Sequence, residues 1–452
     1  MRRAVYLLTL VMIMLASQLS AADWPQFRGP NSSGVSDVKT SLPVKFSAEE
    51  NVRWSKEVGD GIGSPIVVDG RVFVSGMTGE ETVSLFAFDA ASGKLLWQRN
   101  WETGPLAEIH ADNSQASSTP AADKERVYFY FSSLGMMAVD AKTGEDAWHR
   151  ELPTPFFVFK WGPGMSPTLY KDLVILCQDD DINPAVYALD KKTGEVRWKD
   201  DRLDMAVNYS HPVICSHAGG DDLVIAGTGL LIGYDPLTGE RRWQAQVLLR
   251  NIKTTPVAHD GVIYISVQSA GIANQWLASV DRADTGNKDN RLDKAEIQAF
   301  VGELEIPEEF FAKTFDRGDE NKDGFLEGRE LDVAFLHPDN FAGADFTKSG
   351  DDAAAQFIMA VRGGGEGDVT KTHVLWKHKT KHTDHIVSPY IAHDRMFLVK
   401  EGGIRTVFET KNGESTLAPG RVGRGGGYFA SPISGDGKVF IAVEVHTEVR
   451  RR

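Results

Sequence analysis

The chain has 452 residues, of which 42% are hydrophobic, and its formal net charge is −14. Residues 281–352 alone contain 20 acidic and 9 basic side chains, so most of the acidity lies in one segment. The rest of the chain, with 43 acidic and 40 basic side chains, is close to charge balance. Phosphate binding requires clustered basic charge, which argues against a nucleic acid as partner.

The N-terminus has the composition of a secretory signal peptide. Arg2 and Arg3 precede a short apolar run, and small residues before Asp23 offer a cleavage site near Ala22. This pattern is typical of a signal peptide rather than a membrane span. No cysteine lies near the cleavage site and no later stretch reaches ~18 apolar residues. We therefore expect residues 1–22 to be removed from a periplasmic or secreted protein with no lipid anchor and no membrane span.

A nine-residue motif recurs along the chain. It begins with Asp, has Gly four positions later and Trp eight positions later, and follows an apolar run. The complete copies begin at Asp89, Asp140, Asp190 and Asp235. Asp can bond its own turn and Gly adopts a positive φ without steric cost, so each copy predicts a strand, a tight turn and a second strand. We interpret the aspartates as turn formers rather than catalytic groups, and the tryptophans as packing between repeats.

A second motif, a small or polar residue followed by Pro, precedes an apolar strand in step with the first. The residues before Pro are Ser64, Thr119, Ser166, His211, Thr255, Ser388 and Ser431. The motif tryptophans from Trp54 to Trp243 are 43, 51, 50 and 45 residues apart. A period of ~40–50 residues with several short strands per repeat is the signature of β-propeller blades. We predict an all-β propeller of four-stranded blades over residues 51–270 and 353–452, with seven visible blade starts.

The last blade is predicted to be incomplete, because few residues follow Ser431 and they carry no further repeat motif. Near the N-terminus, residues 23–50 are rich in Pro, Gly, Asn and Ser and are predicted to form a loop. Residues 52–54 then have the composition of an outer strand. We expect this strand to pair with the final blade and to close the ring.

The repeat resembles that of the PQQ-like β-propeller superfamily, which includes the assembly lipoprotein BamB and the quinoprotein alcohol dehydrogenases. The resemblance covers residues 50–445 apart from one insertion, and it implies a propeller that commonly has eight blades. Those dehydrogenases typically carry a vicinal cysteine pair beside the quinone, whereas Cys177 and Cys215 are 38 positions apart. Both lie on apolar strands, where they can be buried thiols or, in an exported protein, a disulfide. We do not expect PQQ as a cofactor.

An insertion, residues 271–352, interrupts the fifth blade and contains the clearest metal-binding pattern. Residues 319–330 match the calcium loop of an EF-hand, in which a hard cation takes oxygen ligands at fixed positions. Gly324 supplies the sharp turn. The predicted Ca²⁺ ligands are Asp319, Asn321, Asp323, the carbonyl of Phe325, Glu327 through a water, and Glu330 with two oxygens.

EF-hands usually pair, and a weaker copy of the loop precedes this one. Residues 280–296 echo residues 315–330 with one additional residue, and Asn290 stands in place of the Gly. Asn tolerates the left-handed conformation better than most residues. The candidate ligands are Asp284, Asn287, Asp289, Asp293 and Glu296, and the segment can be either a structural partner or a weak calcium site.

In a four-stranded blade, the loops that join the second and third strands share a face with the loops between blades. The insertion is of the first kind, and two long loops, residues 98–118 and 149–165, are of the second kind. Polar and aromatic groups at this face, the mouth of the propeller, could bind a protein or a small molecule, or could be ordinary loop surface. The candidates are His110, Asn113, Lys160, Trp161, Asn208, His211, Lys253 and His385.

Two functions are consistent with these patterns. The first is a non-catalytic binding or assembly scaffold with a calcium-binding EF-hand module. The second is a calcium-dependent quinoprotein oxidoreductase. The lack of a vicinal cysteine pair and of a Cys-x-x-Cys-His haem motif favours the scaffold.

Overall fold

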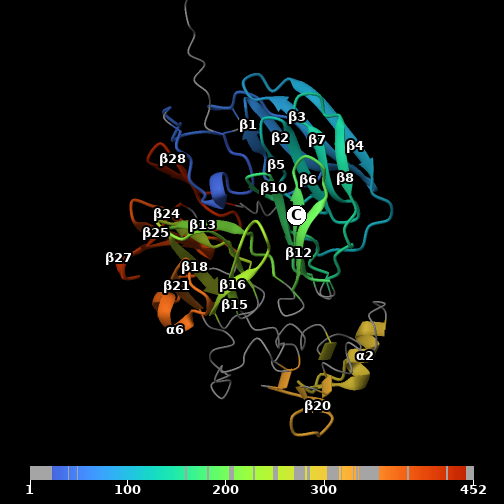
Figure 1. Ribbon diagram of the computed structural model, residues 1–452, viewed down its shortest axis with the longest axis vertical. Helices are drawn as coiled ribbons and strands as arrows, with labels where there is room; N and C mark the ends of the chain where they lie inside the picture. The colour runs from blue at the N-terminus through green and yellow to red at the C-terminus, as the bar shows by residue number, and fades with distance from the viewer. Residues whose placement is uncertain are drawn as a thin grey trace, which may run out of the picture.

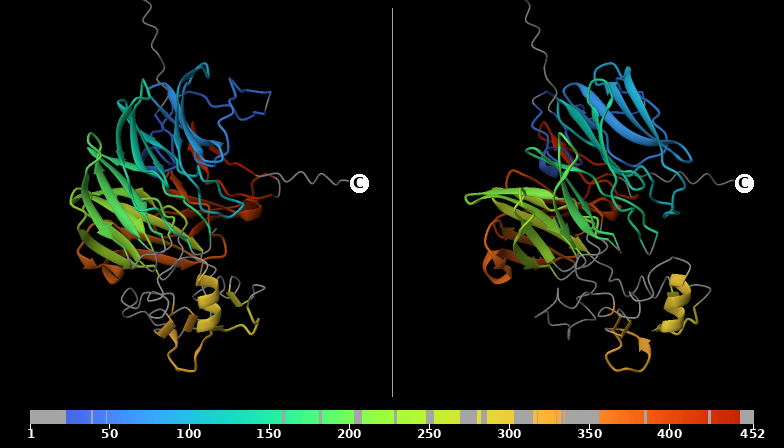
Figure 2. Two further views of the ribbon diagram at one scale, coloured as in Figure 1. Left: turned by 90° about the vertical axis from the view of Figure 1, so that its right-hand side faces the viewer. Right: turned by 45° about the vertical axis from the view of Figure 1, so that its right-hand side comes forward.

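The computed structural model consists mainly of antiparallel sheets arranged around a common centre, with the insertion on one side (Figure 1; Figure 2). The structure describes residues 23–443 apart from 39, 48, 158–159, 181–182, 203–207, 228–229, 248–252, 269–279, 282–285, 303–314, 317, 329, 332–333, 335–355, 384–385 and 424–425. The predicted signal peptide lies outside the described residues. No helix within the described ranges is long and apolar enough to cross a membrane.

Among the described residues, the ring contains five sheets of four antiparallel strands, one sheet of four antiparallel strands with a parallel fifth, and one sheet of two strands. The first two sheets are β1 (Ile66–Val68), β2 (Arg71–Gly79), β3 (Thr82–Asp89) and β4 (Leu95–Glu102), then β5 (Ala121–Ala122), β6 (Arg126–Phe131), β7 (Gly135–Asp140) and β8 (Asp146–Arg150). The next two are β9 (Thr168–Tyr170), β10 (Leu173–Gln178), β11 (Ala185–Asp190) and β12 (Val196–Asp201), then β13 (Val213–His217), β14 (Gly220–Ala226), β15 (Leu230–Tyr234) and β16 (Arg241–Gln246). The remaining three are β17 (Val257–His259), β18 (Val262–Gln268), β21 (Gln356–Arg362) and β23 (Val374–Lys379), then β24 (Tyr390–Ala392), β25 (Arg395–Lys400), β26 (Ile404–Glu409) and β27 (Ser415–Arg421), and finally β28 (Ile433–Gly435) and β29 (Lys438–Phe440).

This architecture is the predicted β-propeller, and each of the seven predicted starts precedes a first strand. The hydrophobic clusters lie between neighbouring blades. One cluster joins Phe73 of β2 to Phe129 of β6, and another joins Ile175 of β10 to Ile225 of β14. Burial of apolar side chains between consecutive blades is the main force that holds such a ring together.

At four junctions, the hydroxyl group of the residue before Pro links one blade to the next. The backbone N–H of Ser64 donates to Thr119 Oγ1 at 2.9 Å, and that of Thr119 donates to Ser166 Oγ at 3.0 Å. On the other side of the ring, the Thr255 N–H donates to Ser388 Oγ and the Ser388 N–H to Ser431 Oγ, both at 2.9 Å. The recurrence of Ser and Thr in this motif therefore has a cause, because a hydroxyl is needed to accept the neighbour's N–H.

The motif tryptophans dock on the turn of the following blade, as predicted. The indole N–H of Trp148 donates to the carbonyl of Lys191 at 2.9 Å, and the ring lies against Gly194. Gly194 has a φ of 71°, and a Cβ added there would lie 2.6 Å from the ring. The same docking joins Trp97 to Gly144, Trp198 to Gly239, Trp376 to Gly413 and Trp54 to Gly93.

Substitution of Gly194 by Ala is expected to destabilise the protein by about 2–3 kcal/mol. A positive φ costs an L-residue about 1–2 kcal/mol, and the new methyl group would also displace the Trp148 ring. Gly70→Ala is the matched control, since Gly70 has a φ of 73° with nothing within 4 Å of the added Cβ. Urea unfolding should show a clearly larger loss for Gly194→Ala. Equal losses would mean that the tryptophan contact contributes nothing.

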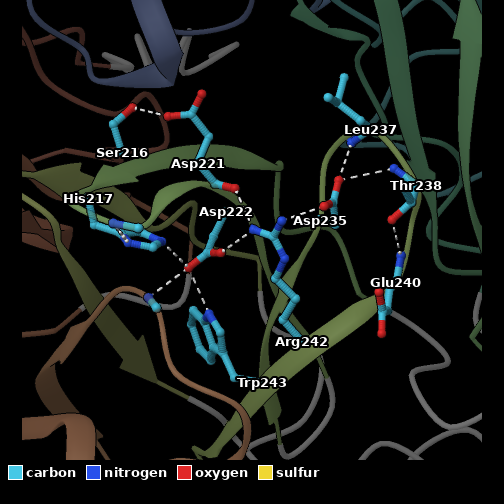
Figure 3. Close-up of polar contacts among 12 residues, drawn as sticks. Ser216, His217, Asp221, Asp222, Asp235, Leu237, Thr238, Glu240, Arg242 and Trp243 are labelled. Carbon is cyan, nitrogen blue, oxygen red and sulfur yellow. Dashed lines mark hydrogen bonds and ion pairs between the residues drawn. The ribbon is translucent and has the colours of Figure 1, made fainter.

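Trp243 packs between the fourth and fifth blades, as predicted, but its indole N–H does not bond to a turn carbonyl of the following blade. Its ring packs against Gly233 of the same sheet, and its indole N–H donates to Oδ2 of the buried Asp222 at 2.8 Å (Figure 3). The same oxygen accepts the Gly364 N–H at 2.8 Å and lies 3.1 Å from His217 Nε2. The next blade has no Asp-to-Gly turn to receive this Trp. Instead, β22 (Gly367–Asp368) adds a parallel fifth strand beside β16, and the short helix α6 (Thr370–His373) follows it.

The predicted closing strand over residues 52–54 is not present, since residues 52–59 belong to no strand. Trp54 nevertheless docks on the first blade, where its indole N–H donates to the Ala90 carbonyl at 3.0 Å. The pairing with the seventh blade comes instead from earlier in the chain. Val35 forms a parallel bridge with Ser434, and the backbones of Gly34 and Ser36 exchange hydrogen bonds with Ser434 at 2.8 Å.

Candidate functional site

Three segments from different blades meet at the mouth of the propeller. They are the loop between β4 and β5, the loop between β8 and β9, and the residues just before β17. Asn113 in the first loop anchors the second, because its Nδ2 donates to the carbonyls of Trp161 at 2.6 Å and Pro163 at 3.1 Å. Gly162 has a φ of 80° and lies against Ile109, so the two loops pack closely.

Trp161 is the centre of this arrangement. The ring of His110 stacks on it with the centroids 4.7 Å apart and an interplanar angle of 29°. The Lys253 ammonium lies 4.8 Å from the ring centroid, a cation–π distance. The indole Nε1 of Trp161 is buried and has no hydrogen-bond partner among the described residues. We call Trp161, His110 and Lys253 the mouth cluster.

Two lysines at the mouth differ in their surroundings. Lys160 is exposed and pairs with Glu108 at 2.8 Å, and the hydrogen bond from this ammonium holds the pKa of the Glu108 carboxyl below its usual range. Lys253 is partly buried, and burial lowers the pKa of its ammonium. Within the described ranges no carboxylate lies within ion-pair distance of Lys253. This ammonium therefore offers a partly desolvated positive charge without an acidic partner in the described chain.

A second aromatic pair lies beside the mouth cluster. The rings of Phe157 and Tyr209 stack with centroids 5.5 Å apart, and a Cβ on Gly164 would lie 3.1 Å from the Tyr209 ring. Both rings pack against Met165 at the edge of a cluster between the second and third blades. The predicted loops thus present aromatic side chains that the fold holds in place.

The structure brings together five of the eight predicted ligand-binding residues: His110, Asn113, Lys160, Trp161 and Lys253. Asn208 is buried, and its backbone bridges that of Asp179. His211 is also buried and contacts Thr168 Oγ1 at 2.6 Å and the ring of Phe27 at 5.1 Å. His385 lies outside the described residues.

In the insertion, residues 319–330 form a tight loop whose side chains accept its own backbone N–H groups. Asp319 accepts from Asp323 and Gly324 at 3.1 Å each. Glu330 accepts from Asn321 at 3.3 Å and from Glu327 at 3.4 Å. These bonds fold the loop so that its first and last carboxylates approach the same backbone.

The first loop repeats this pattern with a different leading residue. The carboxylate of Asp281 accepts the N–H of Asp289 at 2.8 Å and of Asn290 at 3.0 Å, as Asp319 does in the second loop. Glu296 accepts from Asn287 at 2.9 Å and from Asp293 at 3.1 Å, as Glu330 does. The sequence pattern named Asp284, which lies outside the described residues, and missed Asp281.

The two loops are joined by a short ribbon. Strand β19 (Leu292–Asp293) pairs antiparallel with β20 (Phe325–Leu326), and the helix α2 (Lys294–Gly302) follows β19. The Arg291 guanidinium lies 4.0 Å from the centroid of the Phe325 ring. Asn290 has a φ of 64°, so it takes the left-handed conformation that Gly324 takes in the second loop, as expected.

The two cysteines are buried and free. Cys177 lies on β10 and Cys215 on β13, in different blades. Burial, reinforced by the carboxylates of Asp222 and Asp221, raises the pKa of Cys215 to about 12. Such a thiol is protonated at neutral pH and behaves as a small apolar side chain.

Comparison with known proteins shows the family of this chain. The family model described as "Outer membrane protein assembly factor BamB" matches residues 44–157 and 161–318, more than half of the chain. The outer membrane protein assembly factor BamB of Moranella endobia (strain PCIT) is 24% identical over 238 residues, covering 49% of this chain and 58% of that protein. Subunit 1 of the methanol dehydrogenase of Paracoccus denitrificans is 29% identical over 168 residues, covering 33% and 26%.

The chain thus spans 58% and 26% of the lengths of these relatives. Among solved structures, BamB from Moraxella catarrhalis is 13% identical with a TM-score of 0.40, covering 84% of this chain and 91% of that chain. A europium-containing methanol dehydrogenase is 14% identical with a TM-score of 0.41, covering 93% and 89%. By the match of its repeats over more than half of its length, the chain belongs to the PQQ-like propeller family described as outer membrane protein assembly factor BamB.

Proposed function

We propose that the protein is a non-catalytic scaffold that binds a segment of another protein at the mouth of the propeller. The observation that carries this proposal is the mouth cluster. The Trp161 ring contacts both the stacked ring of His110 and the ammonium of Lys253, and its loop is anchored by Asn113. A Trp with a fixed ring, an unpartnered N–H and a neighbouring desolvated charge has the properties of a binding hot spot.

The chemistry of the cluster selects a class of partner. An acidic side chain or a terminal carboxylate would pair with the Lys253 ammonium, whose charge no described carboxylate balances. A carbonyl oxygen would accept from the Trp161 N–H. We therefore infer that the partner is a polypeptide with acidic residues beside apolar or aromatic ones. Relatives named as outer membrane protein assembly factors support a role in the assembly of other proteins, and with the predicted signal peptide they support a periplasmic location.

Selection from a library of displayed random peptides tests this function. Peptides that bind the wild-type protein should be enriched in acidic and aromatic residues. Their affinity for Trp161→Ala should fall by roughly thirtyfold or more, since truncation of a hot-spot residue costs at least about 2 kcal/mol. Leu417→Ala, on an exposed position of an outer strand, should bind as the wild type does. Peptides that bind both variants equally would place binding elsewhere. Quinone absorbance in the purified protein would instead support the dehydrogenase alternative.

We propose in addition that the insertion binds calcium. The second loop offers the carboxylates of Asp319, Asp323 and Glu330 and the amide of Asn321, with the carbonyl of Phe325 and a water held by Glu327 completing the set. The first loop would use Asp281, Asn287, Asp289 and Glu296, although Arg291 competes for Asp289 at 3.2 Å. An all-oxygen, mostly anionic set suits a hard divalent cation. The bound ion would balance the negative charge of the loops and hold the insertion beside the mouth.

A further inference from the structure

The N-terminal segment, residues 24–36, runs across the centre of the propeller and bonds to blade after blade. Trp24 bridges Val67 of the first blade, and the Pro25 carbonyl accepts from Ala122 of the second at 2.8 Å. Gln26 Oε1 accepts from Leu169 of the third, and Asn31 exchanges two hydrogen bonds with Ile214 of the fourth. The blade residue that the segment contacts has the same position in each of the first four blades and in the seventh, where it is Ser434. It lies three positions after the residue that precedes Pro in the Pro motif.

This segment therefore occupies the axis of the ring, and its short helical turn η1 (Pro30–Ser32) lies among the inner strands (Figure 1). We call residues 24–36 the axial plug. It is pinned by hydrogen bonds along its whole length. One side chain in it is not satisfied by those bonds.

Arg28 is that side chain. It is 5% exposed, and its Nη2 donates to the Pro389 carbonyl at 2.5 Å. Its Nε and Nη1 are buried and have no hydrogen-bond partner in the described part of the chain. Gly34, with a φ of 72°, leaves the space beside Nη2 free of a side chain, because a Cβ there would lie 2.9 Å from that nitrogen.

The surroundings of Arg28 contain no described counter-charge. No carboxylate of the described residues pairs with it, and burial alone lowers the pKa of the guanidinium, to about 9. The charge of Arg28 acts on the buried His211, whose pKa is lowered to about 3 by burial and by this charge. At neutral pH the site therefore contains a charged guanidinium and a neutral imidazole. A buried charge with no partner is strongly unfavourable, so a counter-ion from solution is the expected remedy.

We propose that the axial plug binds a small oxyanion at Arg28. A guanidinium with unused N–H donors is the side chain best suited to a carboxylate or phosphate oxygen. The bound anion would neutralise the charge at the axis and satisfy Nε and Nη1. It would also fix the plug against the sixth blade, where Arg28 already holds Pro389.

Thermal unfolding and titration calorimetry of the mature full-length protein test this site. Inorganic phosphate and acetate are the probes, and sodium chloride at equal ionic strength is the reference. A saturable rise in Tm with either probe, absent with chloride, is expected. The two probes separate tetrahedral anions from carboxylates, and a response to either one supports the site.

Arg28→Gln should weaken the binding of the effective probe at least about tenfold, because a hydrogen bond to a charged group is worth at least about one factor of ten in affinity. Arg53→Gln removes the same charge from an exposed position of the N-terminal region and should bind as the wild type does. Amide exchange in residues 24–36 of the wild type should slow when the probe is present, which locates binding even if Arg28→Gln does not fold. No saturable effect beyond that of chloride, equal affinity in a folded Arg28→Gln, or unchanged exchange in the plug would overturn the proposal.

Discussion

Substitution of Glu330 by Gln is expected to weaken calcium binding to the second loop by roughly two orders of magnitude, because EF-hand affinity depends steeply on the number of charged ligands. Glu330 is the twelfth residue of the loop and is largely buried. Its two oxygens already accept the N–H groups of Asn321 and Glu327, so the side chain is oriented across the loop. The amide of Gln would supply one neutral oxygen in place of two charged ones.

Titration calorimetry of the full-length protein with Ca²⁺ measures this effect. Glu320→Gln is the matched control, because Glu320 is in the second position of the same loop, where EF-hands place no ligand, and the change in charge is identical. The control should retain calcium affinity close to that of the wild type. If both variants lost affinity equally, the loop would attract the ion by its net charge and not by a defined coordination shell.

The blades could be predicted from the sequence because their determinants are local and repeated. Asp190 Oδ1 accepts the N–H groups of the two residues that begin the turn, Lys192 at 2.8 Å and Thr193 at 3.0 Å. Gly194 closes the turn with a positive φ and receives the Trp148 ring. Each of these requirements restricts the residue type at a fixed spacing, so the period is visible without the fold.

The exceptions depend on contacts that no local pattern records. Trp243 keeps the motif spacing, but its indole turns to Asp222 because the following blade presents Gly364 in place of the receiving turn. In the first loop of the insertion, the carboxylate of Asp281 accepts the N–H of Asp289, a contact that the repeat spacing does not indicate. The contacts of Trp243 and Asp281 both depend on how a neighbouring segment folds in three dimensions. The spacing of residues in the sequence does not determine that fold.

In the candidate site, too, some residues could be predicted from the sequence and others could not. Loop length and composition were sufficient to select His110, Trp161 and Lys253, which do come together. His211 was selected because it lies in a loop before an inner strand, but its side chain is buried against Thr168 and Phe27 and not at the mouth. Arg28 was not selected, because its significance comes from its burial in the folded chain and not from any motif.

A buried ion pair lies where the loops of the mouth leave the third blade. Its removal is expected to reduce the stability of the protein strongly. Arg202 and Asp179 are both fully buried, with Nε–Oδ1 and Nη2–Oδ2 distances of 2.7 and 2.8 Å. Arg202 also donates to the hydroxyl group of Tyr234. The Asp179 backbone pairs with Asn208, and the neighbouring Asp180 accepts the N–H of Phe156 at 2.9 Å. The pair therefore holds the end of β10 where the loops of the mouth begin.

Replacement of Arg202 by Met is expected to destabilise the protein by about 3–5 kcal/mol, because the buried charge of Asp179 would lose the guanidinium that balances it. Arg197→Met is the matched control, since Arg197 pairs with Asp190 at 3.0 Å on the surface and such pairs contribute at most about 1 kcal/mol. The double variant with Asp179→Leu should recover much of the loss, because no buried charge remains. Guanidinium unfolding followed by tryptophan fluorescence gives all three values. A loss for Arg202→Met no larger than for Arg197→Met would show that water reaches Asp179, and the mouth loops would then have no buried ionic support.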